Sequence, residues 1–172
     1  MEMAKACLAN NTGFGVCLIS KGSEVGEAAS HEPLGCEAQI KDWDMEQLGI
    51  LQVRCVGARR FKILSSEVNS SGLVQAEVEY LEEESDLVLP QEFVPLAALA
   101  QRIIQDIEKK RSNPAQGLVQ EPYDFASASW VSRRLCEFLP IPSSIKHQLM
   151  MLNDPVGRLN LVKHFLEQQG VL

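Results

Sequence analysis

The sequence is poor in the residues that build catalytic and metal centres. It contains only three histidines, and its five cysteines include no pair at the C-x-x-C spacing of zinc or thiol–disulfide sites. It also lacks the G-x-x-x-x-G-K-[ST] loop with which an ATPase holds phosphate. These absences predict a chain with no catalytic residues, no metal site and no cofactor.

Long apolar runs are missing as well. No run approaches the roughly 20 residues of a membrane span, and the N-terminus lacks the charged-then-apolar layout of a signal peptide. The odd number of cysteines favours free thiols in a reducing compartment. We therefore expect a cytoplasmic protein with no membrane partner. With 172 residues, of which 45% are hydrophobic, it can bury a core as one domain or two small ones.

The net charge of −7 is unevenly distributed along the chain. Residues 1–87 carry 7 Lys and Arg against 15 Asp and Glu, whereas residues 88–172 carry 9 against 8. Nucleic-acid affinity depends largely on clustered positive charge. The acidic first half therefore argues against a nucleic acid as the main partner.

The first half has the pattern of short strands. Met3–Leu8 predicts a short helix, and the apolar run Phe14–Ile19 predicts a strand buried on both faces. Trp43–Glu46 predicts a turn. Further strands are expected at 36–41, 50–56, 59–68 and 74–80, with a tight connection at 69–72. Short strands at this spacing are typical of an antiparallel sheet or a small barrel.

The second half has helical periodicity instead. Apolar residues recur at three and four between Phe93 and Ile107, which predicts an amphipathic helix. Three more helices are expected: one capped by Asp124, one starting at Ser143 or Ser144, and one with Asp154-Pro155 at its start. The predicted fold class is α+β, with a β-rich subdomain over 1–87 and a helical bundle over 88–172.

Several local signatures follow one another in an order that matches a known family. Phe14–Ile19, Gly35–Ile40 and Gly57–Phe61 lie in the first half, and Ser129–Val131 and Asp154–Leu159 lie in the second. Together they resemble the N-terminal substrate-recognition domain of the Lon ATP-dependent proteases, found also in small standalone bacterial proteins. The resemblance implies an antiparallel β pseudobarrel of PUA-like topology followed by a helical bundle, and it covers nearly all 172 residues.

The chain departs from the family pattern at its start. Family members open with two strands before the first helix, and Met1–Leu8 resembles that helix. The resemblance therefore implies that the first strands of the barrel are missing and that one edge of the sheet is open. The ATPase and Ser–Lys peptidase segments of full-length Lon proteases do not occur in this sequence either.

Three side-chain combinations invite a chemical reading, and each has a structural one. Cys17 and His31 could pair as thiol and imidazole, but a thiol in an apolar strand has a raised pKa and packs as a small hydrophobe. Ser129 and Lys146 lie on different predicted helices, which disfavours a Ser–Lys dyad. The acidic run 82–86 lacks the spacing of a Ca²⁺ loop and is interpreted as a solvated linker.

The resemblance implies a non-catalytic recognition module that binds unfolded or degron-bearing polypeptides, either alone or with a protease acting in trans. The candidate contact residues are Met3, Lys5, Trp43, Arg59 and Arg60. Two alternatives stay open. A small hydrolase with a cleft between the subdomains would need a pair of perturbed titratable side chains, and a PUA-like RNA-binding module would need a basic stripe.

Overall fold

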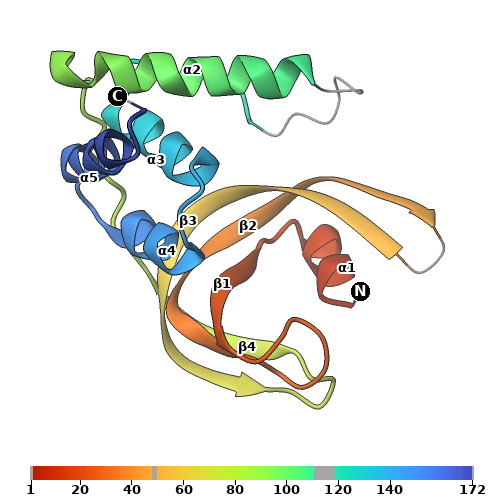
Figure 1. Cartoon of the computed structure of the whole chain (residues 1–172). Helices are drawn as coiled ribbons and strands as arrows, with labels where there is room; N and C mark the ends of the chain where they lie inside the picture. The colour runs from red at the N-terminus through yellow and green to blue at the C-terminus, as the bar shows by residue number, and fades with distance from the viewer. Residues whose placement is uncertain (1, 48–49, 111–118, 172) are drawn as a thin grey trace. The chain divides into compact units, whose positions relative to one another are not determined.

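A computed structural model describes residues 2–47, 50–110 and 119–171 of the chain. The chain divides into two compact units, Met1–Glu82 and Glu83–Leu172, which we call the β unit and the helical unit. The predicted border at residues 87 and 88 falls a few residues after this division. Figure 1 shows the elements of both units, and the predicted α+β class is confirmed.

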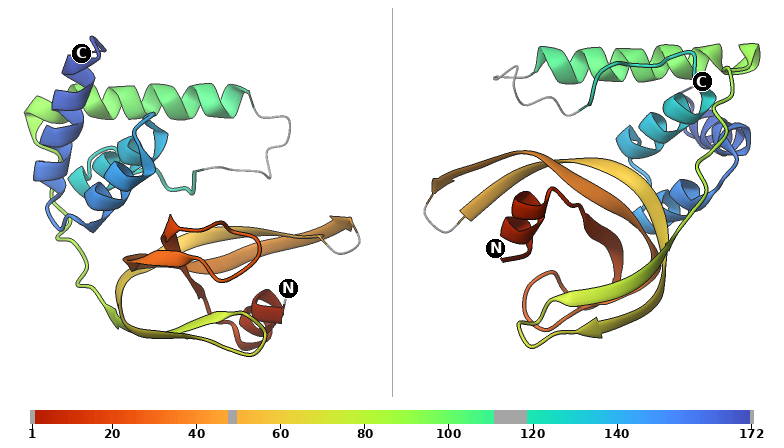
Figure 2. Two further views of the ribbon diagram at one scale, coloured as in Figure 1. Left: turned by 60° about the horizontal axis from the view of Figure 1, so that its bottom comes forward. Right: turned by 180° about the vertical axis from the view of Figure 1, so that it is seen from behind.

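The β unit is a four-stranded antiparallel meander with one helix. Helix α1 (Glu2–Asn10) precedes the strands, and each strand pairs with the next one along the chain. The sheet curves around α1 as an incomplete barrel whose edges are β1 and β4 (Figure 2). The strands are β1 (Phe14–Lys21), β2 (Ser30–Gln47), β3 (Ile50–Val68) and β4 (Val74–Tyr80).

Two predictions about the middle of the sheet were wrong. No turn forms at Trp43–Glu46, because β2 continues through this segment and Trp43 pairs with Val53. The strands expected at 50–56 and 59–68 are one strand, β3, in which a register shift near Gly57 replaces the expected break. Asp44, an acidic residue of the segment expected to turn, is tolerated in the strand because it is exposed.

The expectation that Phe14–Ile19 is buried on both faces was also wrong. Val16 is 50% exposed, and Gly15 is exposed as well. The physical reason is that β1 is an edge strand, with β2 on one side and no strand on the other among the residues described. A continuous apolar run fits an edge strand as well as a central one.

The helical unit contains the core cluster of buried apolar residues found in the described part of the chain. The 3₁₀ turn η1 (Gln91–Phe93) leads into the predicted amphipathic helix, α2 (Val94–Lys109). No helix in the described parts of the chain is long and apolar enough to cross a membrane. The other helices are α3 (Ala128–Phe138), α4 (Ser143–Met151) and α5 (Pro155–Gln168).

The helix caps decide where α3 and α5 begin. Asp154 caps α5 as predicted, since its carboxylate accepts a hydrogen bond from Gly157 N at 3.0 Å. Asp124, however, does not cap α3. Ser127 does so, by accepting a hydrogen bond from Trp130 N at 3.1 Å. Asp124 instead accepts from Ala126 N within the preceding turn.

Candidate functional site

The β2–β3 hairpin extends beyond the four-stranded part of the sheet. β1 pairs with β2 no further than Ala38, and β4 pairs with β3 no further than Phe61. Residues 39–47 of β2 and 50–56 of β3 therefore form a two-stranded arm, with no third strand beside it among the described residues. We call this the hairpin arm.

The arm has one apolar and one polar face. Opposite residues in an antiparallel pair point to the same face, and successive residues alternate. Trp43 pairs with Val53, whereas Asp42 pairs with Arg54 and Asp44 with Gln52. The Trp43–Val53 pair and the alternation along each strand place Trp43, Met45, Leu51 and Val53 on the mainly apolar face. Ile50, which is 54% exposed, lies on the other, mainly polar face.

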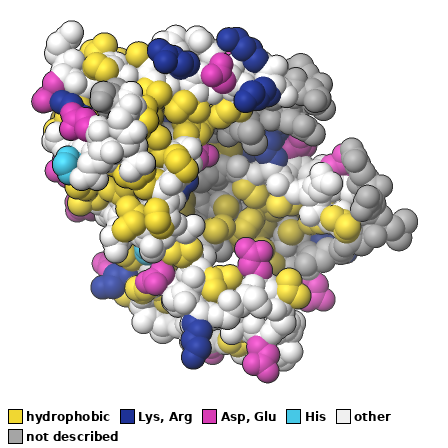
Figure 3. Space-filling view, in the orientation of Figure 1, with side chains coloured by type: hydrophobic (Ala, Val, Ile, Leu, Met, Phe, Trp, Pro, Cys, Tyr) yellow, Lys and Arg dark blue, Asp and Glu magenta, His cyan; other side chains and the backbone are white. Residues whose placement is uncertain are grey.

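The apolar face is open to solvent. The exposed fraction is 55% for Trp43, 40% for Met45 and 39% for Val53. Apolar side chains of the β unit are visible at the surface in the space-filling view (Figure 3). Exposed large apolar side chains that share one face mark a surface able to bind another chain.

The polar face holds the arm's geometry locally. Arg54 Nη2 lies 3.2 Å from Asp42 Oδ2, an exposed ion pair that contributes about 1 kcal/mol at most. The two carboxylates also accept hydrogen bonds from the next backbone amide, Asp42 from Trp43 N at 3.0 Å and Asp44 from Met45 N at 2.6 Å. The acids therefore stay close to the apolar residues that follow them.

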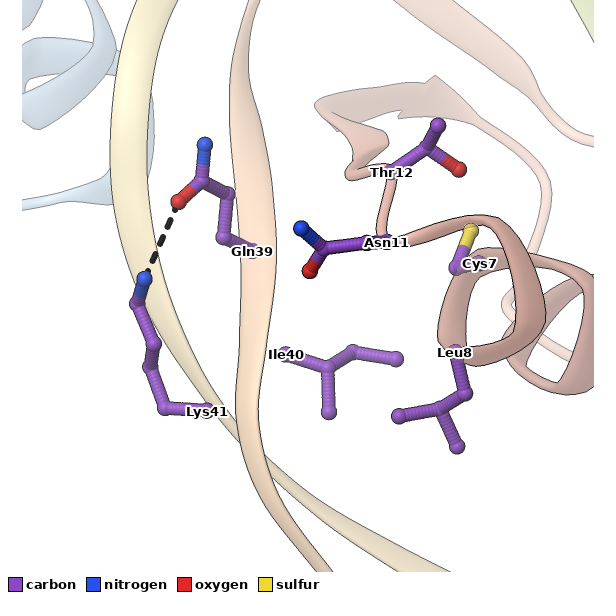
Figure 4. Close-up of a pocket in the computed structure, with 7 residues that line it drawn as sticks. All are labelled: Cys7, Leu8, Asn11, Thr12, Gln39, Ile40 and Lys41. Carbon is purple, nitrogen blue, oxygen red and sulfur yellow. Dashed lines mark hydrogen bonds between the residues drawn. The ribbon is translucent and has the colours of Figure 1, made fainter.

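A small pocket lies at the root of the arm, between α1 and β2. Its volume is about 180 Å³, and its lining residues are Cys7, Leu8, Asn11, Thr12, Gln39, Ile40 and Lys41. Leu8 and Ile40 point toward one another across it, and Asn11 points toward Gln39 (Figure 4). Lys41 Nζ donates to Gln39 Oε1 at 3.1 Å. The amide and hydroxyl groups that line the pocket suit hydrogen bonds to a peptide group. The volume of the pocket suits one side chain of a bound segment.

A buried ion pair lies in the helical unit. Arg158 on α5 is 0% exposed and the side chain of Glu84 is 1% exposed. Arg158 Nη2 donates to both carboxylate oxygens of Glu84, at 2.7 and 2.6 Å. The interpretation of the acidic run 82–86 as a solvated linker was therefore wrong for Glu84.

The remaining donors of Arg158 are also satisfied. Its Nε donates to Ser132 Oγ at 2.9 Å, and its Nη1 donates to the carbonyls of Leu149 at 3.1 Å and Leu152 at 2.8 Å. All five N–H groups of the guanidinium thus have acceptors. One side chain connects α3, the C-terminal end of α4, α5 and the segment that follows the sheet.

Opposing influences act on the pKa of Glu84. Burial of the carboxylate acts to raise it, but hydrogen bonds from Arg158 and Ser129 and the charges of Arg133 and Arg158 outweigh burial. The net result is a pKa below the ordinary value, so the carboxylate is ionised at neutral pH. The network is structural, because every polar group in it is already paired within the unit.

The two candidate catalytic pairs do not form. Ser129 Oγ donates to Glu84 at 2.6 Å, whereas Lys146 Nζ donates to the Glu137 carbonyl at 2.7 Å. Cys17 pairs across strands with Gly35, and burial raises the pKa of its thiol. Within the described residues, no group of three His, Cys, Asp or Glu is arranged to hold a metal ion.

Comparison with known proteins decides the family. The sequence profile of the family described as "ATP-dependent protease La (LON) substrate-binding domain" matches residues 1–168. The chain belongs to the Lon substrate-binding domain family. The resemblance inferred from the ordered motifs is thereby confirmed.

Two solved structures show how far the likeness to other Lon substrate-binding domains extends. A Lon N-terminal domain protein from Xanthomonas campestris is 29% identical, with a TM-score of 0.72, covering 95% of this chain and 81% of that one. The N-terminal domain of Mycobacterium avium complex Lon protease is 15% identical, with a TM-score of 0.50, covering 94% and 79%, and supports the fold alone. Comparison with curated proteins gave no match.

The five predicted contact residues of this Lon domain lie on three elements. Met3 is half-buried and Lys5 exposed on α1, and Trp43 lies on the apolar face of the hairpin arm. The Arg59 guanidinium lies 3.5 Å above the ring of Tyr80. Arg60 is only 8% exposed and donates to the Glu82 carbonyl at 3.2 Å.

Sequence reasoning missed most of the apolar face. The sequence predicts Trp43 as a contact residue on a turn, but it does not bring Met45, Leu51 and Val53 together with it. The signal was present, because apolar residues alternate with polar ones on both sides of residues 47–50. The acidic residues between the apolar ones obscure this signal, because they also suit a turn.

Proposed function

We propose that this Lon substrate-binding domain is a non-catalytic recognition module for unfolded or degron-bearing polypeptides. The observation that carries the proposal is the exposed apolar face of the hairpin arm, centred on Trp43. Folded proteins rarely present contiguous apolar stretches, whereas unfolded chains do. A surface of this kind therefore distinguishes the two by the chemistry of what they expose.

Binding would draw most of its free energy from a few side chains. Covering the exposed half of an indole removes on the order of 100 Å² of apolar surface, which is worth about 2–3 kcal/mol. Met45 and Val53 add less, since each is smaller and about two-fifths exposed. Because association itself costs several kcal/mol, the affinity of one domain for one segment is modest. Several copies acting together would bind more tightly.

The pocket beside α1 would contribute hydrogen bonds rather than hydrophobic contact. Asn11, Thr12 and Gln39 offer amide and hydroxyl groups at its rim, within reach of a peptide backbone passing over Leu8 and Ile40. Such contacts tolerate many sequences, as recognition of unfolded chains requires. The bound segment would then be available to a protease acting in trans.

A cytoplasmic location suits this role. All five cysteines are free thiols, as expected in a reducing compartment. Their packing also explains why they persist without disulfides: Cys7 and Cys136 are buried, and burial raises the pKa of the Cys55 thiol. Cys7 lines the pocket beside α1, and Cys55 lies two residues after Val53 on the arm.

Fluorescence anisotropy of a labelled, permanently unfolded polypeptide tests the proposal. We expect saturable binding by the native protein and binding weakened about tenfold or more by Trp43→Ser. Leu64→Ser is the matched control, because Leu64 is 57% exposed on β3 but lies outside the arm. Equal loss in both variants, or no binding by the folded native protein, would contradict the proposal.

A further inference from the structure

The charges around the hairpin arm restrict which polypeptide segments suit its apolar face. We infer that the arm selects apolar segments flanked by Lys or Arg over the same segments flanked by Asp or Glu. This inference rests on the proposed function, since it names the class of segment that the same surface binds. It depends on three features of the β unit.

The first feature is the position of the arm's carboxylates. Asp42 and Asp44 alternate with Trp43 and Met45 along β2, so Trp43 and Met45 each follow an acid. Each carboxylate accepts a hydrogen bond from the amide of the next residue. The negative charges are therefore fixed beside the apolar face, not distributed over freely moving side chains.

The second feature is the thinness of the arm. It is a single layer of two strands about 4.8 Å apart, with no third strand among the described residues. A ligand on the apolar face lies within one Debye length, about 8 Å at physiological salt, of charges on the other face. Lys and Arg side chains are also long enough to reach around the edge of a ribbon while their stems stay on apolar surface.

The third feature is the balance of charge. Arg54 lies against Asp42, whereas Lys41 keeps its charge because its partner Gln39 is neutral. Over residues 39–56 the sequence has two basic residues against three acidic ones, a net charge of −1. Asp44 accepts only a backbone N–H among the contacts found in the described part of the chain. Over residues 1–82 the sequence has 7 Lys and Arg against 12 Asp and Glu, so the field of the whole unit has the same sign as Asp44. A segment with basic flanks is therefore attracted both by Asp44 nearby and by the net negative charge of the whole unit. A segment with acidic flanks is repelled by both.

The same charge balance argues against a second copy of this chain as the occupant. Two β units would bring like net charges together over an exposed surface, which opposes association. A basic-flanked segment of an unfolded client has no such penalty. The occupant is therefore the client segment, and sedimentation of the protein alone tests whether a second copy takes its place. A dimer that dissociates in Trp43→Ser but persists in Leu64→Ser would overturn the inference.

Two labelled peptides with the same apolar core, one flanked by Lys and one by Glu, provide the main test. In about 50 mM salt we expect the Lys-flanked peptide to bind about fivefold tighter, and the ratio to approach one as salt is raised. Equal binding at low salt would overturn the inference and leave the proposed function standing. Failure of both peptides, together with the unfolded polypeptide, would contradict the proposed function itself.

Charge reversal locates the effect on the arm. Asp44→Lys and Glu79→Lys change the net charge equally, but Glu79 lies on β4 opposite Lys62, away from the arm. We expect Asp44→Lys to reduce the preference for the Lys-flanked peptide about threefold or more, with Glu79→Lys leaving it nearly unchanged. An equal reduction in the two variants would overturn the assignment to the arm.

Discussion

Replacing Glu84 by Ala tests whether the buried ion pair holds the helical unit together. Arg158 would lose two of its five hydrogen bonds. Ser129 would lose its hydrogen-bond acceptor, and Arg133 would lose its partner in an ion pair. The guanidinium is 0% exposed, so water cannot replace the missing carboxylate without opening the core. The variant therefore leaves a charge buried and uncompensated.

The expected loss in free energy of unfolding is about 3–5 kcal/mol, the range for removing one partner of a buried pair. This is a large share of the roughly 5–15 kcal/mol that stabilises a typical domain. Glu83→Ala is the control, since Glu83 is the exposed neighbour of Glu84 in the same acidic run. It should change stability by less than about 0.5 kcal/mol.

Urea denaturation followed by Trp130 fluorescence measures this loss, because Trp130 lies on α3 beside the network. A Trp43→Phe background leaves Trp130 as the single indole of the two in the sequence. Replacing both partners, with Glu84→Leu and Arg158→Met, should recover part of the loss by removing the orphaned charge. A Glu84→Ala variant within about 1 kcal/mol of the parent protein would refute the reasoning.

The same pair gives a pH dependence of known sign. The pKa of Glu84 is lowered in the folded state. The contribution of Glu84 to the free energy of unfolding is therefore fully present above the pKa of Glu in the unfolded chain, about 4.3. This stabilisation is lost as the pH falls through the lower pKa that Glu84 has in the folded protein. The stability difference between the native protein and Glu84→Gln should therefore be constant near neutral pH and shrink on acidification below about 4.3.

Two further substitutions, each with a matched control, test a close contact in the β unit and a helix cap in the helical unit. Gly35→Ala should cost about 1–3 kcal/mol, because a Cβ there would lie 2.7 Å from the Phe61 ring, whereas Gly57→Ala meets its nearest atom at 3.5 Å and should be nearly neutral by urea denaturation. Ser127→Ala should cost about 1–2 kcal/mol by removing the cap of α3, and the exposed Ser144→Ala, which caps no helix, should cost little in a thermal melt.

Local patterns predicted most of the fold. The three-and-four periodicity of α2, the Asp154-Pro155 start of α5 and the alternation of β4 each carry their signal within a few residues. The order of the motifs was enough to indicate the family. These features were predictable because short-range sequence determines them.

The parts that could not be predicted depend on contacts between distant residues. Glu84 looks like its neighbours in an acidic run, and its partner Arg158 lies 74 positions away. Whether Phe14–Ile19 is an edge or a central strand depends on which strands pair with it. The alternation of the arm is visible in the sequence, but the pairing of Trp43 with Val53 depends on the register between β2 and β3.

The indole N–H signals of the two tryptophans provide the most direct test of the central claim. Trp43 lies on the apolar face of the arm in the β unit, and Trp130 is half-buried on α3 in the helical unit. In a ¹⁵N–¹H NMR titration with a permanently unfolded polypeptide, we predict a saturable shift of the Trp43 signal and a Trp130 signal that stays in place. A shift of Trp130 alone, or of neither signal, would contradict the account.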